Sequence, residues 1–95
     1  MEFPEGFEWD SRKREENLKK HGIDFWDVTH FFEDPNTLEF KDDRMDYDEE
    51  RRVIIGMLQA ILVSVVFTER GEAIRLFSAR KSTAHERKKF AEGED

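Results

Sequence analysis

The chain has 95 residues and no cysteine, 41% of its residues are charged, and its formal net charge is −7. This length accommodates one small domain and excludes a second. The absence of cysteine excludes disulfide and thiolate chemistry and favours a reducing compartment. The net negative charge argues against an indiscriminate nucleic-acid binder. The sequence shows no signal segment and no apolar run long enough for a membrane span. We therefore expect a cytoplasmic protein with one domain over residues 1–95, a core at about residues 6–91 and no membrane partner.

Charge is distributed unevenly along this chain. Residues 33–50 carry nine acidic and two basic side chains, a net charge of −7, which equals the net charge of the whole chain. Residues 69–90 carry seven basic and three acidic side chains, a net charge of +4. An anionic ligand is therefore expected at the basic segment, unless both segments are merely solvated surface. The acidic pair Asp42-Asp43 is expected to be solvated charge in a loop.

The first predicted elements are a short strand at residues 6–9 and a helix that Asp10 caps and Gly22 ends. The helix is mostly polar, and Leu18 is its expected anchor. Side chains at spacings of three and four residues share one side of this helix; they are Lys13, Asn17, Lys20 and His21. His21 either interacts with the helix C-terminus or serves a functional site, and the sequence leaves both open.

A second helix is predicted to begin at Asp24 and to stop before residues 34–35. Phe25, Val28 and Phe32 follow the i, i+3, i+7 spacing of a buried helical stripe. Phe31 falls off that stripe, and so do two neighbouring ring side chains. We expect the stripe through Phe32 to be buried, and we expect core packing to account for most of the rings that lie off it.

Strands are predicted at residues 37–41, 51–58, 61–67 and 73–79, and the third of these reads as a central strand because both of its faces are apolar. Gln59-Ala60 is a poor hairpin turn by residue type. A Thr83-x-x-Glu86 capping box opens a last helix at residues 84–91. The order β-α-α-β-β-β-β-α predicts an α+β domain with an antiparallel sheet (a β-meander), two N-terminal helices and one C-terminal helix.

The residue types available for chemistry are cations and imidazoles. The three histidines lack metal-ligand spacing, and no phosphate-binding loop or serine nucleophile elbow is present. RNA cleavage can proceed without these features, because the 2′-hydroxyl is an internal nucleophile and the protein needs only to move protons and to neutralise phosphate charge. We therefore predict no metal site and no cofactor.

Arg75 and Arg80 are candidate phosphate ligands because a guanidinium binds phosphate bidentately. They are five residues apart, so a regular strand would send their side chains to opposite faces. They can converge only if the strand bends or ends near Ser78-Ala79. The alternative is that Arg75 faces solvent or pairs with an acid.

Several short motifs occur in order along nearly the whole chain. They are FEWD at residues 7–10, KHG at 20–22, FEDP at 32–35, GML at 56–58, TERG at 68–71 and IRLFSARKST at 74–83. With Lys13, Asn17 and Phe25 between them, this ordered set strongly resembles the BrnT family over about residues 7–90. The BrnT proteins are toxins of bacterial type II toxin–antitoxin systems.

The resemblance implies a fold similar to that of the RelE-type ribonuclease toxins and a metal-independent RNA endonuclease that halts translation. It also implies a BrnA-like antitoxin that neutralises the toxin in a heterotetramer and itself binds the operator DNA. By position, the resemblance implies that Arg75 and Arg80 bind phosphate and the transition state and that His21 is a general acid or base. The RNA-binding residues that it implies are Lys13, Lys20, Trp9, Lys81 and Arg87.

Two departures from the family pattern bear on activity and fold. Phe90 stands where family members often have tyrosine, and the remaining tyrosine, Tyr47, lies in the acidic loop, so tyrosine-assisted catalysis is not expected. Gln59-Ala60 replaces an Asp-Gly type of turn. The alternative function is a non-catalytic binding module, or a degenerate toxin that acts as a corepressor with its antitoxin.

Overall fold

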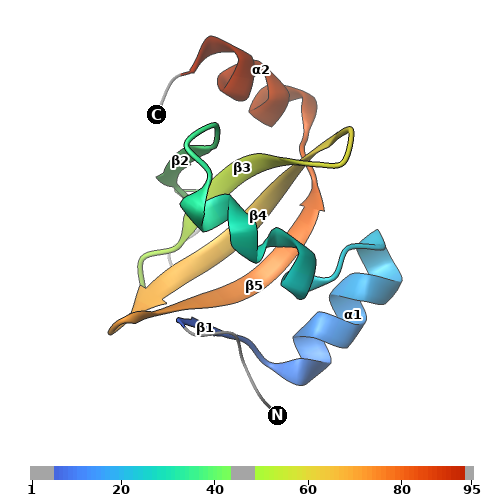
Figure 1. The fold of residues 1–95 in the computed structure, drawn as a ribbon, viewed down its shortest axis with the longest axis vertical. Helices are drawn as coiled ribbons and strands as arrows, with labels where there is room; N and C mark the ends of the chain where they lie inside the picture. The colour runs from blue at the N-terminus through green and yellow to red at the C-terminus, as the bar shows by residue number, and fades with distance from the viewer. Residues whose placement is uncertain (1–5, 44–48, 94–95) are drawn as a thin grey trace.

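The structure, a computed structural model, describes residues 6–43 and 49–93. It is a small α+β domain whose elements follow the predicted order (Figure 1). The helices are α1 (Ser11–His21), the 3₁₀ helix η1 (Phe25–Glu33) and α2 (Ala84–Glu92). The strands are β1 (Phe7–Glu8), β2 (Leu38–Lys41), β3 (Arg52–Leu58), β4 (Ile61–Arg70) and β5 (Ala73–Lys81).

The strands form one five-stranded sheet in the order β1-β5-β4-β3-β2. The meander from β2 to β5 is antiparallel, and β4 is the central strand, as predicted. The expectation of a purely antiparallel sheet is wrong, because β1 pairs with β5 in parallel, Phe7 opposite Ile74 and Glu8 opposite Arg75. Side-chain alternation in a strand carries no information about strand direction, so the sequence pattern could not reveal this pairing.

The β3–β4 hairpin has the two-residue turn that its residue types disfavoured. Leu58 pairs with Ile61, and Gln59 between them adopts φ 53°. A residue other than glycine is rarely found at positive φ. The continuous apolar pairing of β3 with β4 therefore outweighs the poor turn residues.

Helix α1 has the predicted ends. The Asp10 side chain accepts a hydrogen bond from the Arg12 N–H, and Gly22 ends the helix with φ 71°. The predicted anchor is wrong, since Leu18 is 46% exposed. Asn17 takes that role: its carboxamide donates to the carbonyl oxygens of Ile23 and Ala79 at 2.9 and 2.8 Å and accepts from the Ala79 N–H at 3.0 Å. This side chain pairs with the open edge of β5 as an added strand would.

The second helix is a 3₁₀ helix rather than an α-helix, and this changes which phenylalanine is buried. Phe25, Val28 and Phe31 are fully buried, because a period of three residues aligns them on one side. The predicted stripe through Phe32 is therefore wrong, and Phe32 is only partly buried against the core. Gly56 makes the close approach of η1 possible, because a Cβ there would lie 2.9 Å from the Phe31 ring.

The sheet has two differently covered faces. One face, which we call the η1 face, is covered by η1 (Figure 1). This face carries the larger core, which includes Ile54, Val63, Val65, Phe67 and Leu76. The opposite face carries a smaller cluster of Val53, Ile55 and Val66, on which Phe40, Leu62, Phe77 and Phe90 pack partly buried. We call it the α2 face, because Phe90 comes from α2. Half-buried aromatic rings on this face remain accessible to a ligand.

Candidate functional site

A bulge in β5 places Arg75 and Arg80 on the same face of the sheet. Val66 pairs with Ser78 and Phe67 pairs with Leu76, which leaves Phe77 as an extra residue in β5. A bulge of this kind reverses the alternation of side chains beyond it. The bend that the sequence required near Ser78-Ala79 is therefore present, and both arginines belong to the α2 face.

A cavity of about 250 Å³ lies where α1 meets β5. It is lined by the predicted Lys13, Asn17, Lys20 and His21, together with Glu16, Phe77 and Ser78. The four predicted side chains therefore do share one side of α1, and that side faces the sheet. Two cations flank the Phe77 ring, with Lys13 Nζ at 5.0 Å and Arg51 Cζ at 3.8 Å from its centroid.

The surroundings of His21 at this cavity favour its neutral form. Burial lowers the pKa of His21 below its ordinary value of 6.5, and the charges of Lys20 and Arg80 lower it further. An imidazole that is neutral at pH 7 can accept a proton. Arg80 lies two residues beyond Ser78, which lines this cavity, on the same face of β5.

Arg75 is paired with an acid, which is the alternative that the sequence left open. Its Nη1 lies 3.3 Å from Glu8 Oε1, and Arg70 Nη1 lies 3.7 Å from the same carboxylate oxygen. Both pairs follow from the parallel β1 strand, which sets Glu8 beside Arg75. Since the pair is partly exposed, water screens its attraction, and a phosphate could compete for Arg75.

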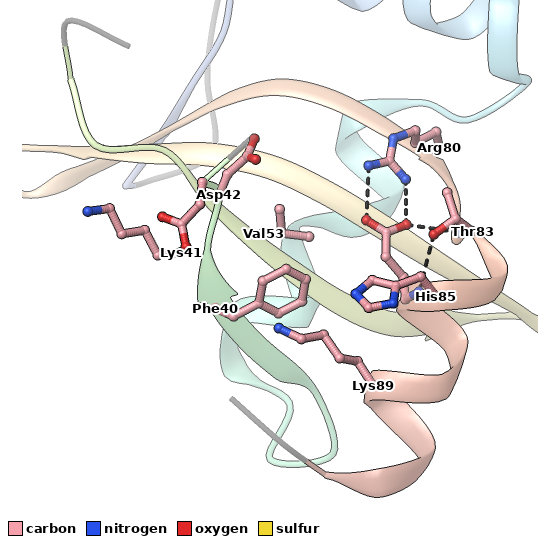
Figure 2. Close-up of a pocket in the computed structure, with 10 residues that line it drawn as sticks. Phe40, Lys41, Asp42, Val53, Arg80, Thr83, His85 and Lys89 are labelled. Atoms are coloured by element: carbon pink, nitrogen blue, oxygen red, sulfur yellow. Dashed lines mark hydrogen bonds and ion pairs between the residues drawn. The ribbon is translucent and has the colours of Figure 1, made fainter. Parts of the chain in front are cut away.

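Arg80 is bound more tightly, by the most buried glutamate among the described residues. Its Nη1 and Nη2 donate to Glu86 Oε1 and Oε2 at 2.6 and 3.0 Å (Figure 2). Glu86 Oε1 also accepts from the Thr83 N–H at 2.9 Å and from the Ser64 hydroxyl at 3.0 Å. Burial alone would raise the pKa of Glu86, but the Arg80 hydrogen bond and charge, the Thr83 N–H and the Ser64 hydroxyl outweigh burial and lower it to about 2.

Arg80 and Glu86 form one wall of a second, larger cavity of about 390 Å³ between β2, β3 and α2 (Figure 2). Phe40, Val53, His85 and Lys89 line it as well, and Lys89 Nζ lies 4.1 Å from the Phe40 ring centroid. Asp42 also lines this cavity and is buried, so the expectation that it is solvated charge is wrong. Arg80 lines this larger cavity, and Ser78, two residues before it on the same face of β5, lines the smaller one.

The remaining predicted RNA-binding residues lie away from these cavities. Trp9 is buried in the core, edge-on to Phe25 and Trp26, so its ring is not available to RNA in this conformation. Lys81 is exposed and lines a separate apolar hollow with His21, Leu58 and Ile61, so His21 is common to this hollow and to the α1–β5 cavity. Arg87 is exposed on α2 and donates to the Ser82 carbonyl oxygen at 2.8 Å.

Four residues of the site were missed by sequence reasoning: Glu8, Arg51, Phe77 and Glu86. Glu8 and Arg51 reach the site only through the parallel β1 strand and the β5 bulge, and neither feature has a signal in the side-chain pattern. Glu86 was recognised as a helix-capping residue, but its second role depends on Arg80 and Ser64 facing it. Tyr47 lies outside the described residues.

The described residues contain no group of three His, Asp or Glu side chains that could hold a metal ion. None of the helices in the part of the chain that the structure describes is long and apolar enough to cross a membrane. What the site offers is one imidazole with a lowered pKa, several cations and partly exposed aromatic rings on one sheet face. Such a combination can hold phosphate groups, stack bases and transfer protons.

A small α+β domain with cations and aromatic rings on one open sheet face is suited to binding RNA. A protein-family model described as "Ribonuclease toxin, BrnT, of type II toxin-antitoxin system" matches residues 9–86, most of the chain. The chain therefore belongs to the BrnT family of ribonuclease toxins. No curated protein matches this chain.

Proposed function

We propose that this BrnT protein is a metal-independent endoribonuclease whose active site is the cavity between α1 and β5. The observation that carries the proposal is the meeting of Lys13, Lys20 and His21 at this one cavity, with Arg80 two residues beyond Ser78 on the same face of β5. Phe77 supplies an aromatic surface in the same cavity, on which a base can stack.

The proposed reaction is attack of the RNA 2′-hydroxyl on the adjacent phosphorus. The 2′-oxygen–phosphorus bond forms, the bond from phosphorus to the 5′-oxygen of the next nucleotide breaks, and the products are a 2′,3′-cyclic phosphate and a free 5′-hydroxyl. His21 accepts the proton of the 2′-hydroxyl, which its lowered pKa permits at pH 7. Arg80, Lys13 and Lys20 neutralise charge on the phosphate, and a water or a lysine ammonium group protonates the leaving oxygen.

The biological setting proposed here follows from the family. Membership of a type II toxin–antitoxin family implies an antitoxin partner. We propose a BrnA-like antitoxin that forms a heterotetramer with this chain in the cytoplasm, blocks translation arrest and alone contacts operator DNA. We also propose that the fold is of the RelE type.

The test is cleavage of a single-stranded RNA by the purified protein in buffer with EDTA. The wild-type protein and a Lys19→Ala variant are expected to cleave, because Lys19 is exposed on α1 and does not line the cavity. His21→Ala and Lys20→Ala should each lower kcat/KM by roughly 100-fold, the usual contribution of a proton-transfer or charge-stabilising group. Cleavage that requires added Mg²⁺, or that is unchanged by both substitutions, would contradict the proposal.

A second candidate function is a non-catalytic binding module that acts as a corepressor with its antitoxin. The observation that favours it is the pairing of Arg75 with Glu8 and of Arg80 with Glu86. Carboxylates already occupy both arginines that were expected to bind phosphate. This function predicts a tight antitoxin complex, no growth arrest when the chain is expressed alone, and no cleavage in the EDTA assay.

A further inference from the structure

The most highly connected buried side chain of the α2 face is Glu86, a residue that the proposed reaction does not use. Three different elements hold its carboxylate: Ser64 on β4, Arg80 on β5 and the backbone N–H of Thr83 at the start of α2. The Ser64 hydroxyl is fixed in turn by Ser82 at 2.7 Å. A carboxylate with this many fixed partners has one position and one orientation.

Glu86 also leaves part of Arg80 available to a ligand. A guanidinium carries five N–H donors, on Nε, Nη1 and Nη2. The two contacts with Glu86 use one donor from each Nη atom, across the end of the guanidinium. The Arg80 side chain remains 18% exposed, and it lines the larger cavity. No hydrogen bond among the described residues uses Arg80 Nε, so this N–H can donate to a phosphate while Glu86 holds the two Nη atoms.

We infer that Glu86 is a positioning residue for RNA cleavage, which fixes the plane of the Arg80 guanidinium so that its free edge meets the scissile phosphate. The inference rests on the proposed function, because it presupposes that Arg80 binds the phosphate undergoing cleavage. Glu86 then raises kcat without touching RNA. A fixed guanidinium loses little conformational freedom when the transition state forms, whereas an unpaired arginine side chain must be immobilised in that step.

The competing possibility is that Glu86 occupies Arg80 in place of phosphate and so inhibits the protein. The two possibilities predict opposite effects of Glu86→Gln. Glutamine keeps the shape of the side chain and can still close the capping box of α2, but it lacks the charge that holds the guanidinium. Loss of positioning lowers kcat, and loss of inhibition raises activity.

The experiment measures kcat and KM for RNA cleavage in EDTA by wild type, Glu86→Gln and the control Glu92→Gln. Glu92 is exposed on the same helix, so its substitution makes the same charge change without touching the network. We expect Glu86→Gln to lower kcat by about 10-fold to 100-fold, the effect of misplacing a catalytic group by about 1 Å, with little change in KM. Glu92→Gln should match the wild type.

Repeating the Glu86→Gln substitution in an Arg80→Lys protein distinguishes positioning of Arg80 from a general effect on the fold. Lysine has no planar group to orient, so Glu86→Gln should have almost no additional effect on kcat in an Arg80→Lys protein. An equal loss of kcat in both backgrounds would mean that Glu86 is only structural. Unchanged or increased activity of Glu86→Gln in an otherwise active protein would also overturn the inference.

The activity of the wild-type protein distinguishes failure of the proposed function from failure of the positioning role alone. If the wild type does not cleave RNA, the proposed function fails and the positioning role fails with it. If the wild type cleaves and Glu86→Gln cleaves equally well, only the positioning role fails. Should Glu86→Gln not fold, Ser64→Ala removes a single donor from the carboxylate, and we expect it to lower kcat about threefold through the same loss of order.

Discussion

Arg80 and Arg75 have the same side chain and lie on the same sheet face, yet their surroundings give them different properties. The Arg80–Glu86 pair is largely buried, with bidentate geometry and further donors on the carboxylate. The Arg75–Glu8 pair is more exposed and makes a single contact of 3.3 Å. Arg80 is therefore a fixed group with one free edge, and Arg75 is a cation that a ligand can recruit.

This difference leads to a prediction about the stability of Arg80→Ala. The substitution leaves the Glu86 carboxylate buried without its main partner, so it should lower the free energy of unfolding by roughly 2 kcal/mol, less than for a fully buried pair. The double variant Arg80→Ala with Glu86→Gln removes that buried charge and should recover part of the loss. Urea unfolding of the wild type and the three variants measures both effects. A double variant that is less stable than either single variant would contradict them.

His21 gives a prediction about the pH dependence of cleavage. Since burial, Lys20 and Arg80 lower the pKa of His21 below 6.5, its neutral form persists below the pH at which a free histidine would be protonated. The value of kcat/KM, which follows the free enzyme, should rise with pH through an inflection below 6.5 and level off near neutrality. Lys20→Ala removes one of the charges that lower the pKa, so the inflection should move to higher pH. Lys19→Ala is the control and should leave it in place.

At the scale of the elements, the sequence predicts what local residue types determine. The caps of α1 and α2 were correctly located by Asp10, Gly22 and Thr83, because each acts within one helical turn. The central position of β4 followed from its two apolar faces. These features depend on residues that are close together in the chain, so the sequence alone is enough to predict them.

The features that sequence reasoning missed depend on contacts between distant elements. The 3₁₀ form of η1 reflects the seating of Phe31 over Gly56, which a helical stripe through Phe32 does not reveal. The parallel β1 strand and the Phe77 bulge depend on the register with β5. Of the candidate site, the cluster on α1 was predictable from its spacing, whereas the carboxylates facing the arginines and the burial of Trp9 were not.

Asn17 joins α1 to β5 by hydrogen bonds, and this contact leads to a prediction about local stability. Asn17→Ala removes the hydrogen bonds to the Ala79 backbone and to the Ile23 carbonyl. We expect a loss of about 2 kcal/mol, since buried backbone groups are left unsatisfied. Hydrogen exchange of the Ala79 amide should accelerate, while amides of the β3–β4 hairpin keep their protection. Lys19→Ala is the control for alanine substitution on α1. Equal acceleration of Ala79 amide exchange in both variants would contradict the role of Asn17 in holding α1 to β5.

For the molecule as a whole, the acidic segment is partly paired with arginines in the fold, and one of these arginines belongs to the basic segment. Glu39 and Glu50 contact Arg52, and Glu49 contacts Arg70. The acidic stretch is therefore less available to a partner than its sequence indicates. Lys13 and Lys20 lie instead at the α1–β5 cavity, where Glu16 offsets part of their positive charge.

The free energy of unfolding should depend on pH in a way that reflects the lowered pKa of Glu86. Its pKa is about 2 in the folded chain and 4.5 for an ordinary glutamate, so the unfolded chain binds the proton first as pH falls. The stabilisation is complete above pH 4.5 and is lost between about 4.5 and 2, with a magnitude on the order of 2–3 kcal/mol. Urea unfolding across this range should show a steeper decline for the wild type than for Glu86→Gln. Parallel curves for the two proteins would contradict this prediction.

The central claim is that RNA itself supplies the nucleophile and that the α1–β5 cavity activates it. The most direct measurement compares cleavage, in EDTA, of an RNA oligonucleotide and of the same oligonucleotide with one 2′-deoxynucleotide at the cleaved position. We predict that the wild type cleaves the RNA to a 2′,3′-cyclic phosphate and leaves the substituted position intact, and that His21→Ala cleaves the RNA roughly 100-fold more slowly. Cleavage at the 2′-deoxy position, or a product with a 5′-phosphate, would contradict the account.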